Sequence, residues 1–194
     1  NGIADNVLNT AANMANDAVV TASDIAGMSL GTAVAPGAGS IAGAALGSGL
    51  AMAASSDILV VSEKASLGLP EVDVGLLGGC SHAMRLFSHS KLRRMALTGL
   101  RVSGAELYRL GIVEACVEPD LLMPTALEIA NTIAAKSPVS TRMGKHTLNV
   151  IENMSLRDGY RYEQDMTAQI GKTEDAKEAQ KAFAEKRAPV FVGR

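Results

Sequence analysis

The sequence predicts an α/β fold whose last third is helical. A glycine-rich stretch over 37–49 leads into a short apolar helix and then an apolar, β-branched run, which is typical of a buried strand. A second apolar run, at 113–117, follows a short predicted helix and reads as another strand. From residue 119 onward the apolar residues recur at helical spacing. The middle of the chain is therefore expected to be of βα type, and the end helical.

The individual elements follow from local signals. The first forty residues predict no definite element, and the first helix is expected over 50–55, before a strand over 58–61. Ser103 and Glu106 have the spacing of a capping box, a pattern that predicts the start of a helix. Gly111 is expected to end that helix.

The C-terminal third is predicted to hold a series of helices. A helix is expected over 119–136, and Ser137 followed by Pro138 is typical of the start of the next one. Two more helices are expected to begin near Ser155 and Thr173, which are good N-cap residues.

Composition excludes several classes of protein. A chain of 194 residues fits one domain with a substantial core. The net charge of −2 and the aromatic content of 3% argue against a nucleic-acid surface. Two cysteines, Cys80 and Cys116, are too few for a disulfide framework and favour a reducing, cytoplasmic compartment. No basic segment precedes an apolar run at the start, so we expect no secretory signal.

Residues 25–56 contain no charged residue, which raises the possibility of a membrane span. Seven of these residues are Gly and ten are Ala, and Pro36 interrupts the stretch. This composition favours buried glycine-rich turns over a membrane helix, and we expect no contact with a membrane.

Two nucleotide-binding interpretations of the glycines are weak. A dinucleotide turn requires Gly-x-Gly-x-x-Gly, and after Gly37 and Gly39 the next glycine, Gly43, comes one residue too late. The spacing of Gly43, Gly47 and Gly49 resembles the cofactor turn of short-chain dehydrogenases. That family also uses a tyrosine followed four residues later by lysine. The residues four positions after Tyr108, Tyr160 and Tyr162 are Ile112, Gln164 and Met166, so no such lysine is present.

A third interpretation is chemistry on an enolate. Closely spaced glycines around Ser48 allow backbone N–H groups to approach a ligand oxygen. Glu71 follows the rigid Pro70, so its carboxylate is held where it can move a proton next to that oxygen.

The motifs in this part of the chain resemble those of the crotonase (enoyl-CoA hydratase/isomerase) superfamily over residues 43–194. The resemblance implies a crotonase-like fold with a spiral ββα core over 1–118, compacted at its N-terminal part, and a helical trimerisation region over 119–194. The motifs are Ala44 and Leu46-Gly47-Ser48-Gly49-Leu50, Ser56-Asp57-Ile58, Gly68-Leu69-Pro70-Glu71 with Gly75, Arg85-Leu86, Leu97-Thr98-Gly99, Ala105-Glu106, Gly111-Ile112-Val113 and Glu185-Lys186-Arg187.

The resemblance also implies a site. Family members hold a thioester oxygen with two backbone N–H groups, which correspond here to those of Ser48 and Ser23. Ala22 stands where the family has glycine beside the second donor. Glu71 matches the carboxylate that moves protons, and Ala22, Gly47 and Pro70 are expected to line the substrate.

The reaction type depends on Ala51, which occupies the position of a second glutamate in the family's hydratases. Enoyl-CoA hydratase is the activity that the overall resemblance implies, whereas a single carboxylate favours a double-bond isomerase. The alternative from another class is a catalytically silent subunit for coenzyme A binding or assembly. The expected partners are an acyl-CoA substrate and further copies of the chain, as a homotrimer or hexamer, with no cofactor other than the coenzyme A thioester.

Other reactive residues have simpler interpretations. Cys80 and His82 could form a nucleophile and its base, but a small thiol packed in a turn is favoured. His89 and His146 have no ligand-like neighbours, so no metal site is predicted. Basic residues could meet coenzyme A phosphates, although a solvated helical face is favoured; they are Arg85, Lys91, Arg93, Arg94 and Arg101.

Overall fold

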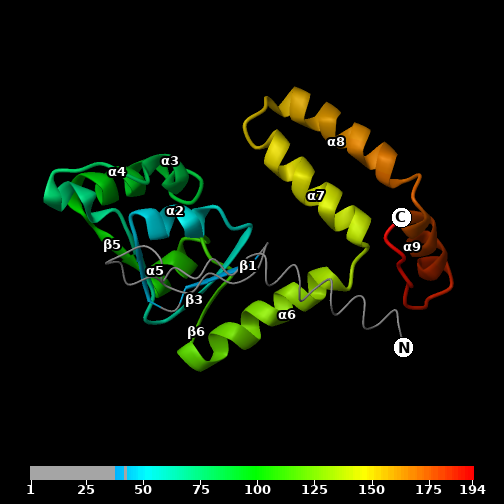
Figure 1. Cartoon of the computed structure of the whole chain (residues 1–194), viewed down its shortest axis with the longest axis horizontal. Helices are drawn as coiled ribbons and strands as arrows, with labels where there is room; N and C mark the ends of the chain where they lie inside the picture. Colours follow the sequence, from blue (N-terminus) through cyan, green and yellow to red (C-terminus); the bar gives the residue numbers. More distant parts are fainter. Residues whose placement is uncertain (1–37, 42) are drawn as a thin grey trace. The chain divides into compact units, whose positions relative to one another are not determined.

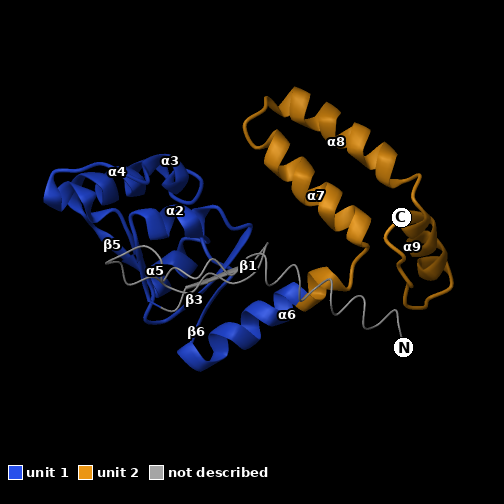
Figure 2. Ribbon diagram, in the orientation of Figure 1, with its two compact units in different colours: residues 1–130 blue, residues 131–194 orange. Residues whose placement is uncertain are grey.

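The computed structural model describes residues 38–41 and 43–194. The chain divides into two compact units, 1–130 and 131–194 (Figure 2). The first unit contains both β-sheets, and the second contains the C-terminal helices. No helix among the described residues is both long and apolar enough to cross a membrane.

The first unit contains two three-stranded sheets together with helices (Figure 1). Sheet A has the order β1-β3-β6 and is entirely parallel. Sheet B has the order β2-β4-β5, with β2 parallel to β4 and β5 antiparallel to β4. The strands are β1 (Ala38–Ile41), β2 (Ala44–Leu46), β3 (Ile58–Ser62), β4 (Ser66–Gly68), β5 (Arg101–Ser103) and β6 (Ala115–Val117).

The chain alternates between the two sheets and so generates a ββα spiral. It contributes β1 to sheet A and β2 to sheet B, and then forms helix α2 (Ser48–Ala54). It repeats this pattern with β3, β4 and the helical segments that follow. This arrangement confirms the predicted α/β, crotonase-like fold.

β3 is the central strand of sheet A and is buried on both faces, as its β-branched sequence predicts. Successive side chains point to opposite faces of a strand. Val60 packs against helix α6 (Leu122–Ala134), whereas Leu59 and Val61 belong to the larger core cluster together with Leu50 of α2. Both faces of β3 therefore contribute to a packed core.

Short helices follow sheet B in the chain: a 3-10 helix η2 (Pro70–Val74), α3 (Cys80–Ala83) and α4 (His89–Thr98). η2 packs against α4. Arg85, just after α3, donates a hydrogen bond of 3.0 Å to the carbonyl oxygen of Ala54. This bond ties the turn after α3 to the C-terminal end of α2.

Four predicted helix starts are confirmed by N-cap hydrogen bonds, which typically stabilise a helix by about 1 kcal/mol each. In every case the capping hydroxyl accepts from the backbone N–H three residues later. Helix α6 begins later than expected, because the segment starting at Pro119 forms a separate 3-10 turn, η3 (Pro119–Leu121). The capped helices are α5 (Gly104–Arg109), α7 (Pro138–Ile151), α8 (Leu156–Ile170) and α9 (Glu174–Ala184), with caps Ser103, Ser137, Ser155 and Thr173.

The prediction of turns throughout the glycine-rich stretch is wrong. The described part of this stretch contains strands β1 and β2, where turns were expected. These strands are only four and three residues long and consist mainly of Ala, Gly and Ser, so they lack the β-branched pattern that marks β3. Their pairing with β3 and β4 supplies what local propensity does not.

Asp175 holds the second unit together. Its carboxylate is fully buried and accepts hydrogen bonds from the Ser137 hydroxyl at 2.8 Å and from the backbone N–H groups of Val192 and Gly193 at 2.7 and 3.1 Å. Burial by itself would raise the pKa of Asp175, but these hydrogen bonds and the charge of Arg142 outweigh it and lower that pKa. The C-terminal segment is thus fastened to the starts of α7 and α9.

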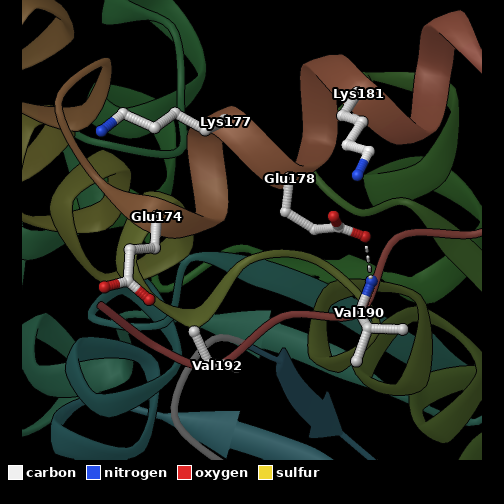
Figure 3. A pocket seen from close by; sticks show the side chains of 6 residues that line it. All are labelled: Glu174, Lys177, Glu178, Lys181, Val190 and Val192. Atoms are coloured by element: carbon white, nitrogen blue, oxygen red, sulfur yellow. Dashed lines mark hydrogen bonds between the residues drawn. The ribbon is translucent and has the colours of Figure 1, made fainter.

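A surface pocket of about 350 Å³ lies near the hydrogen bonds of Asp175, between α9 and the C-terminal segment (Figure 3). The acids lining it already have partners. Glu178 binds both the Arg187 guanidinium and the backbone N–H of Val190, and Glu174 pairs with Arg194. The hydrogen bonds from Arg187 and Val190 lower the pKa of Glu178 to about 2. These acids support the C-terminal segment and offer no unpaired group for catalysis.

Candidate functional site

The site forms where two parallel strands of sheet B end side by side. Leu46 of β2 pairs with Gly68 of β4. Directly beyond them, the backbone N–H of Gly47 donates to the carbonyl oxygen of Gly68 at 3.1 Å. The carboxyl ends of parallel strands meet at one edge of a sheet, so the segments leading to Ser48 and Glu71 start next to each other.

Glu71 is held in place by the local backbone. Pro70 opens η2 at the first helical position, where its fixed φ is favourable. Gly75 closes η2 in the left-handed conformation, with φ of 73°. The Glu71 carbonyl accepts from the backbone N–H of Leu76 at 2.9 Å. The carboxylate is therefore presented from a short, well-defined turn.

Two glycines, Gly47 and Gly78, lie against this carboxylate, and Gly79 lies next to Gly47; the three are named the glycine cup. A Cβ on Gly47 would overlap Oε1 of Glu71, and a Cβ on Gly78 would lie 3.4 Å from the same oxygen. A Cβ on Gly79 would lie 2.8 Å from the Leu69 side chain and 3.3 Å from the Gly47 carbonyl oxygen. A side chain at Gly47 would enter the space that the acid occupies, whereas a methyl group at Gly78 would only contact it.

One oxygen of this acid is left unsatisfied. Oε2 of Glu71 is buried and has no hydrogen-bond partner among the described residues, and it is the one buried side-chain N or O atom in that state in this part of the chain. An unpaired buried polar atom costs about 1–3 kcal/mol. In native proteins such an atom often marks a functional group whose partner is a ligand or water.

Ser48 is the first residue of α2 and is exposed. The preceding Gly47 has φ of 54° and ψ of −115°, a conformation that favours glycine, and its carbonyl oxygen accepts from Ala51 at 3.1 Å. The structure thus joins Gly47 and Glu71 in direct contact, with Ser48 and Pro70 adjacent to them in the chain. The predicted second donor, Ser23, and its neighbour Ala22 lie outside the described residues.

Asp73 does not supply a second carboxylate at this site. Its two oxygens lie against Gly99, at the C-terminal end of α4, where a Cβ would be 2.6 and 2.9 Å from them. Glu71 instead lies against the glycine cup. The two acids of η2 thus contact different elements of the first unit, and Ala51 remains an alanine with no acid in its place.

The other reactive candidates are engaged structurally. The Cys80 thiol packs against the core and donates to the Gly78 carbonyl oxygen at 3.6 Å, in keeping with a packed thiol. Lys91 pairs with Glu106 at 3.0 Å. Hydrogen bonds from Arg109 and then Lys91 lower the pKa of Glu106 to about 2. Two of the suggested phosphate-binding residues, Arg85 and Lys91, therefore have internal partners.

Sequence reasoning did not single out Gly78 and Gly79, although they contact the acid and its surroundings. The available signal was the glycine pair itself, seven residues after Glu71. Gly79 has φ of 69°, which favours glycine. Their proximity to the carboxylate depends on how the chain returns after η2, which local patterns do not predict.

Comparisons with known proteins agree with this architecture. The family profile described as Enoyl-CoA hydratase/isomerase matches residues 11–194. A Mycobacterium tuberculosis protein, named (7aS)-7a-methyl-1,5-dioxo-2,3,5,6,7,7a-hexahydro-1H-indene-carboxyl-CoA hydrolase, is 37% identical over 138 residues, which cover 71% of this chain and 56% of the relative. The Short-chain-enoyl-CoA hydratase of Clostridium acetobutylicum is 34% identical over 142 residues, covering 72% of this chain and 54% of the relative.

Solved structures of the same kind share the fold. A crystal structure described as an enoyl-CoA hydratase subunit I from Geobacillus kaustophilus matches with a TM-score of 0.78 and 32% identity, over 82% of this chain and 63% of that one. The chain spans just over half the length of the two curated relatives. The profile match and the shared fold agree, and the chain belongs to the enoyl-CoA hydratase/isomerase family.

Proposed function

We propose that this chain acts on an acyl-CoA thioester by forming an enolate. The backbone N–H of Ser48 stabilises the thioester oxygen as it gains negative charge, and Glu71 moves the proton at the neighbouring carbon. The observation that supports this proposal best is the buried, unpartnered Oε2 of Glu71 in contact range of the glycine turn before Ser48.

The roles follow from general catalytic chemistry. Removing a proton next to a carbonyl places charge on the carbonyl oxygen, and one backbone donor aimed at that oxygen lowers the barrier by about 3 kcal/mol. A positioned carboxylate contributes a further factor of about 10²–10⁴. By resemblance, Ser23 supplies the second donor, and Ala22, Gly47 and Pro70 line the substrate.

Both an isomerase and a hydratase fit this scheme, and Ala51 favours the isomerase. Adding water to a double bond benefits from one carboxylate to activate water and another to handle the carbon-bound proton. Glu71 is the one carboxylate at the described site. Moving a proton between two carbons requires one such group.

The proposal is tested by exchange of the α-protons of hexanoyl-CoA in D₂O, followed by NMR. We expect the chain to catalyse this exchange and E71Q to reduce it by about 10³-fold, because an amide cannot accept the proton. E163Q, a matched change of an exposed glutamate on α8, is expected to leave the rate unchanged. Undiminished exchange by E71Q would show that another group moves the proton.

A catalytically silent subunit is the rival function. It predicts that the wild-type chain binds hexanoyl-CoA, as measured by calorimetry, but exchanges no α-proton. Binding without exchange would therefore replace the enzymatic proposal with the silent one.

Restoring the missing acid tests the role of Ala51. In A51E we expect hydration of trans-2-hexenoyl-CoA to rise at least tenfold, because a second carboxylate becomes available to activate water. If hydration does not rise, Ala51 is not the reason for a low hydratase activity.

We also propose that the chain assembles with copies of itself, as a homotrimer or hexamer. Large apolar side chains are exposed on the helices of the second unit, where self-association would cover them; among them are Leu148, Leu156 and Phe183. Sedimentation equilibrium distinguishes these assemblies from a monomer, and a monomer at micromolar concentration would contradict the proposal.

A further inference from the structure

We propose that Arg101 is a specificity-determining residue that binds a second carboxylate on the acyl group of the substrate. This inference rests on the proposed function and extends it to a substrate class, the thioesters of short dicarboxylic acids. Two observations carry it: the position of Arg101 at the end of sheet B, and the way its side chain leans across the neighbouring strand.

Arg101 is the one charged residue in the six described strands. It is the first residue of β5, which runs antiparallel to β4, and it pairs with the last residue of that strand, Gly68. Gly68 pairs in turn with Leu46, the last residue of β2. The three residues therefore form a row across sheet B, at the end from which the chain continues to Ser48 and Glu71.

This row lies on the face of sheet B that is turned away from the main core. Side chains alternate between the two faces of a strand. The next row along the sheet consists of Ala45, Leu67 and Val102, which all belong to the larger core cluster. Arg101 is exposed and Leu46 is half-buried. A ligand can therefore reach Arg101 without entering the core.

Gly68 allows the side chain of Arg101 to lean across β4. A Cβ on Gly68 would be 3.0 Å from Cγ of Arg101 and 3.1 Å from Cδ2 of Leu46. The two side chains thus approach each other over the space that a side chain on Gly68 would occupy. A glycine inside a strand often marks such a close approach. The stem of Arg101 therefore leans toward β2, the strand that leads to Ser48.

The guanidinium of Arg101 makes no hydrogen bond or ion pair with any residue that the structure describes. Lys91 and Arg109, by contrast, both pair with Glu106. A guanidinium can bind both oxygens of a carboxylate at once, through two parallel N–H donors. Arg101 is therefore a cation that can bind a carboxylate on a ligand.

The position of Arg101 fits the acyl group better than the phosphates of coenzyme A. Neighbouring strands lie about 4.8 Å apart, so the Cα atoms of Arg101 and Leu46, two strands apart, are separated by about 10 Å. Ser48 follows Leu46 by two residues, and a thioester carbonyl held by its N–H group has its acyl chain within reach of a long side chain. The phosphates are separated from the thioester by the whole pantetheine arm.

The experiment compares acyl groups that differ only in a terminal carboxylate, by α-proton exchange in D₂O. The pairs are succinyl-CoA with butanoyl-CoA, glutaryl-CoA with pentanoyl-CoA, and adipoyl-CoA with hexanoyl-CoA. In at least one pair we expect the wild type to prefer the diacid thioester at least tenfold in kcat/KM, and R101Q to lose this preference. A charge-assisted hydrogen bond contributes a factor of about 10–100. R101K should retain part of the preference, because the charge remains.

R161Q is the matched control, since Arg161 is an exposed arginine on α8. Its preference should equal that of the wild type. The preference is a ratio within one sample, so it does not depend on the fraction of folded protein.

The same acyl groups on N-acetylcysteamine, which carries no phosphate, separate the two kinds of anion. A bound carboxylate predicts that the preference, and its loss in R101Q, persist on this carrier. If R101Q instead slows both coenzyme A thioesters of each pair equally and neither N-acetylcysteamine thioester, Arg101 binds phosphate and the inference is wrong.

Two further results separate this inference from the proposed function. A wild type that exchanges the monoacid thioesters without preferring any diacid, or a preference that survives in R101Q, would overturn the inference and leave the enolate function intact. A wild type that exchanges none of the six coenzyme A thioesters would overturn the proposed function itself.

Discussion

Two carboxylates near the starts of helices, Glu71 in the first unit and Asp175 in the second, have opposite surroundings. Asp175 accepts hydrogen bonds from one hydroxyl and two backbone N–H groups, and the charge of Arg142 supports its ionised form. Glu71 has one buried oxygen with no hydrogen-bond partner among the described residues and lies against two glycines. Both acids are carried by helices with well-defined starts.

The difference teaches how to separate a structural acid from a candidate catalytic one. A buried carboxylate whose oxygens are all satisfied stabilises the fold, and its removal leaves several donors unpaired. A carboxylate with an unsatisfied oxygen contributes little to stability and has capacity left for a ligand or a proton. Changes at the two positions should therefore have opposite effects on stability and activity.

The largest effect on stability is expected for D175N. The amide has only one oxygen that can accept, and its NH₂ group would face the donors that now bind the second carboxylate oxygen. The free energy of unfolding should therefore fall by about 3 kcal/mol. Urea unfolding measures this change, with D165N on the exposed part of α8 as the matched control. A loss of less than about 1 kcal/mol would mean that Asp175 is not the main fastening of the second unit.

S137A should have the next largest effect, about 2 kcal/mol. The Ser137 hydroxyl both caps α7 and donates to the buried Asp175. S155A removes a similar cap whose hydroxyl bonds the exposed Asp158, and it should cost about 1 kcal/mol. Equal losses in the two variants, measured by urea unfolding, would show that burial of the acid adds nothing.

Acid should reduce the difference between the wild type and D175N. The folded-state pKa of Asp175 is lowered, so its stabilising contribution is complete above the unfolded-state value of about 3.9 and is lost progressively as the pH falls from there through the lower folded-state pKa. The difference between the urea midpoints of the two proteins should therefore begin to narrow as the pH falls below about 4. Because other acids are common to both, a constant difference would contradict the assigned direction of the shift.

The smallest change in stability is expected for E71Q. Oε2 of Glu71 makes no hydrogen bond that the substitution could remove, so unfolding free energy should change by less than about 1 kcal/mol. The same variant is expected to lose most of its exchange activity. A large destabilisation would instead assign Glu71 a structural role like that of Asp175.

Local chemistry made the helices predictable, whereas four of the six described strands depend on non-local pairing and were not predicted. Ser137 and Thr173 cap the predicted helices because an N-cap needs only a hydroxyl and the next few residues. β1, β2, β4 and β5 have three or four residues each and little pattern, so their existence depends on partners elsewhere in the chain. β3 was recognisable because it is buried on both faces.

For the site, the sequence motifs indicated Gly47 and Glu71, which the fold brings into contact. The catalytic roles of these residues remain predictions. Gly78 was missed because its importance arises from the path of the chain after η2, which has no local signature. The unsatisfied oxygen of Glu71 is likewise a property of packing alone, visible once the surrounding backbone is in place.

The central position of β3 has a consequence for the order of folding. Its residue Val60 pairs on one side with Ser40 of β1, but on the other side with Ala115 of β6, much later in the chain. Until β6 is synthesised and docked, the apolar β3 has an open edge that can pair with another chain. Such long-range pairing is slow to form. We therefore expect aggregation during synthesis to compete with completion of sheet A until β6 pairs with β3 and covers its open edge.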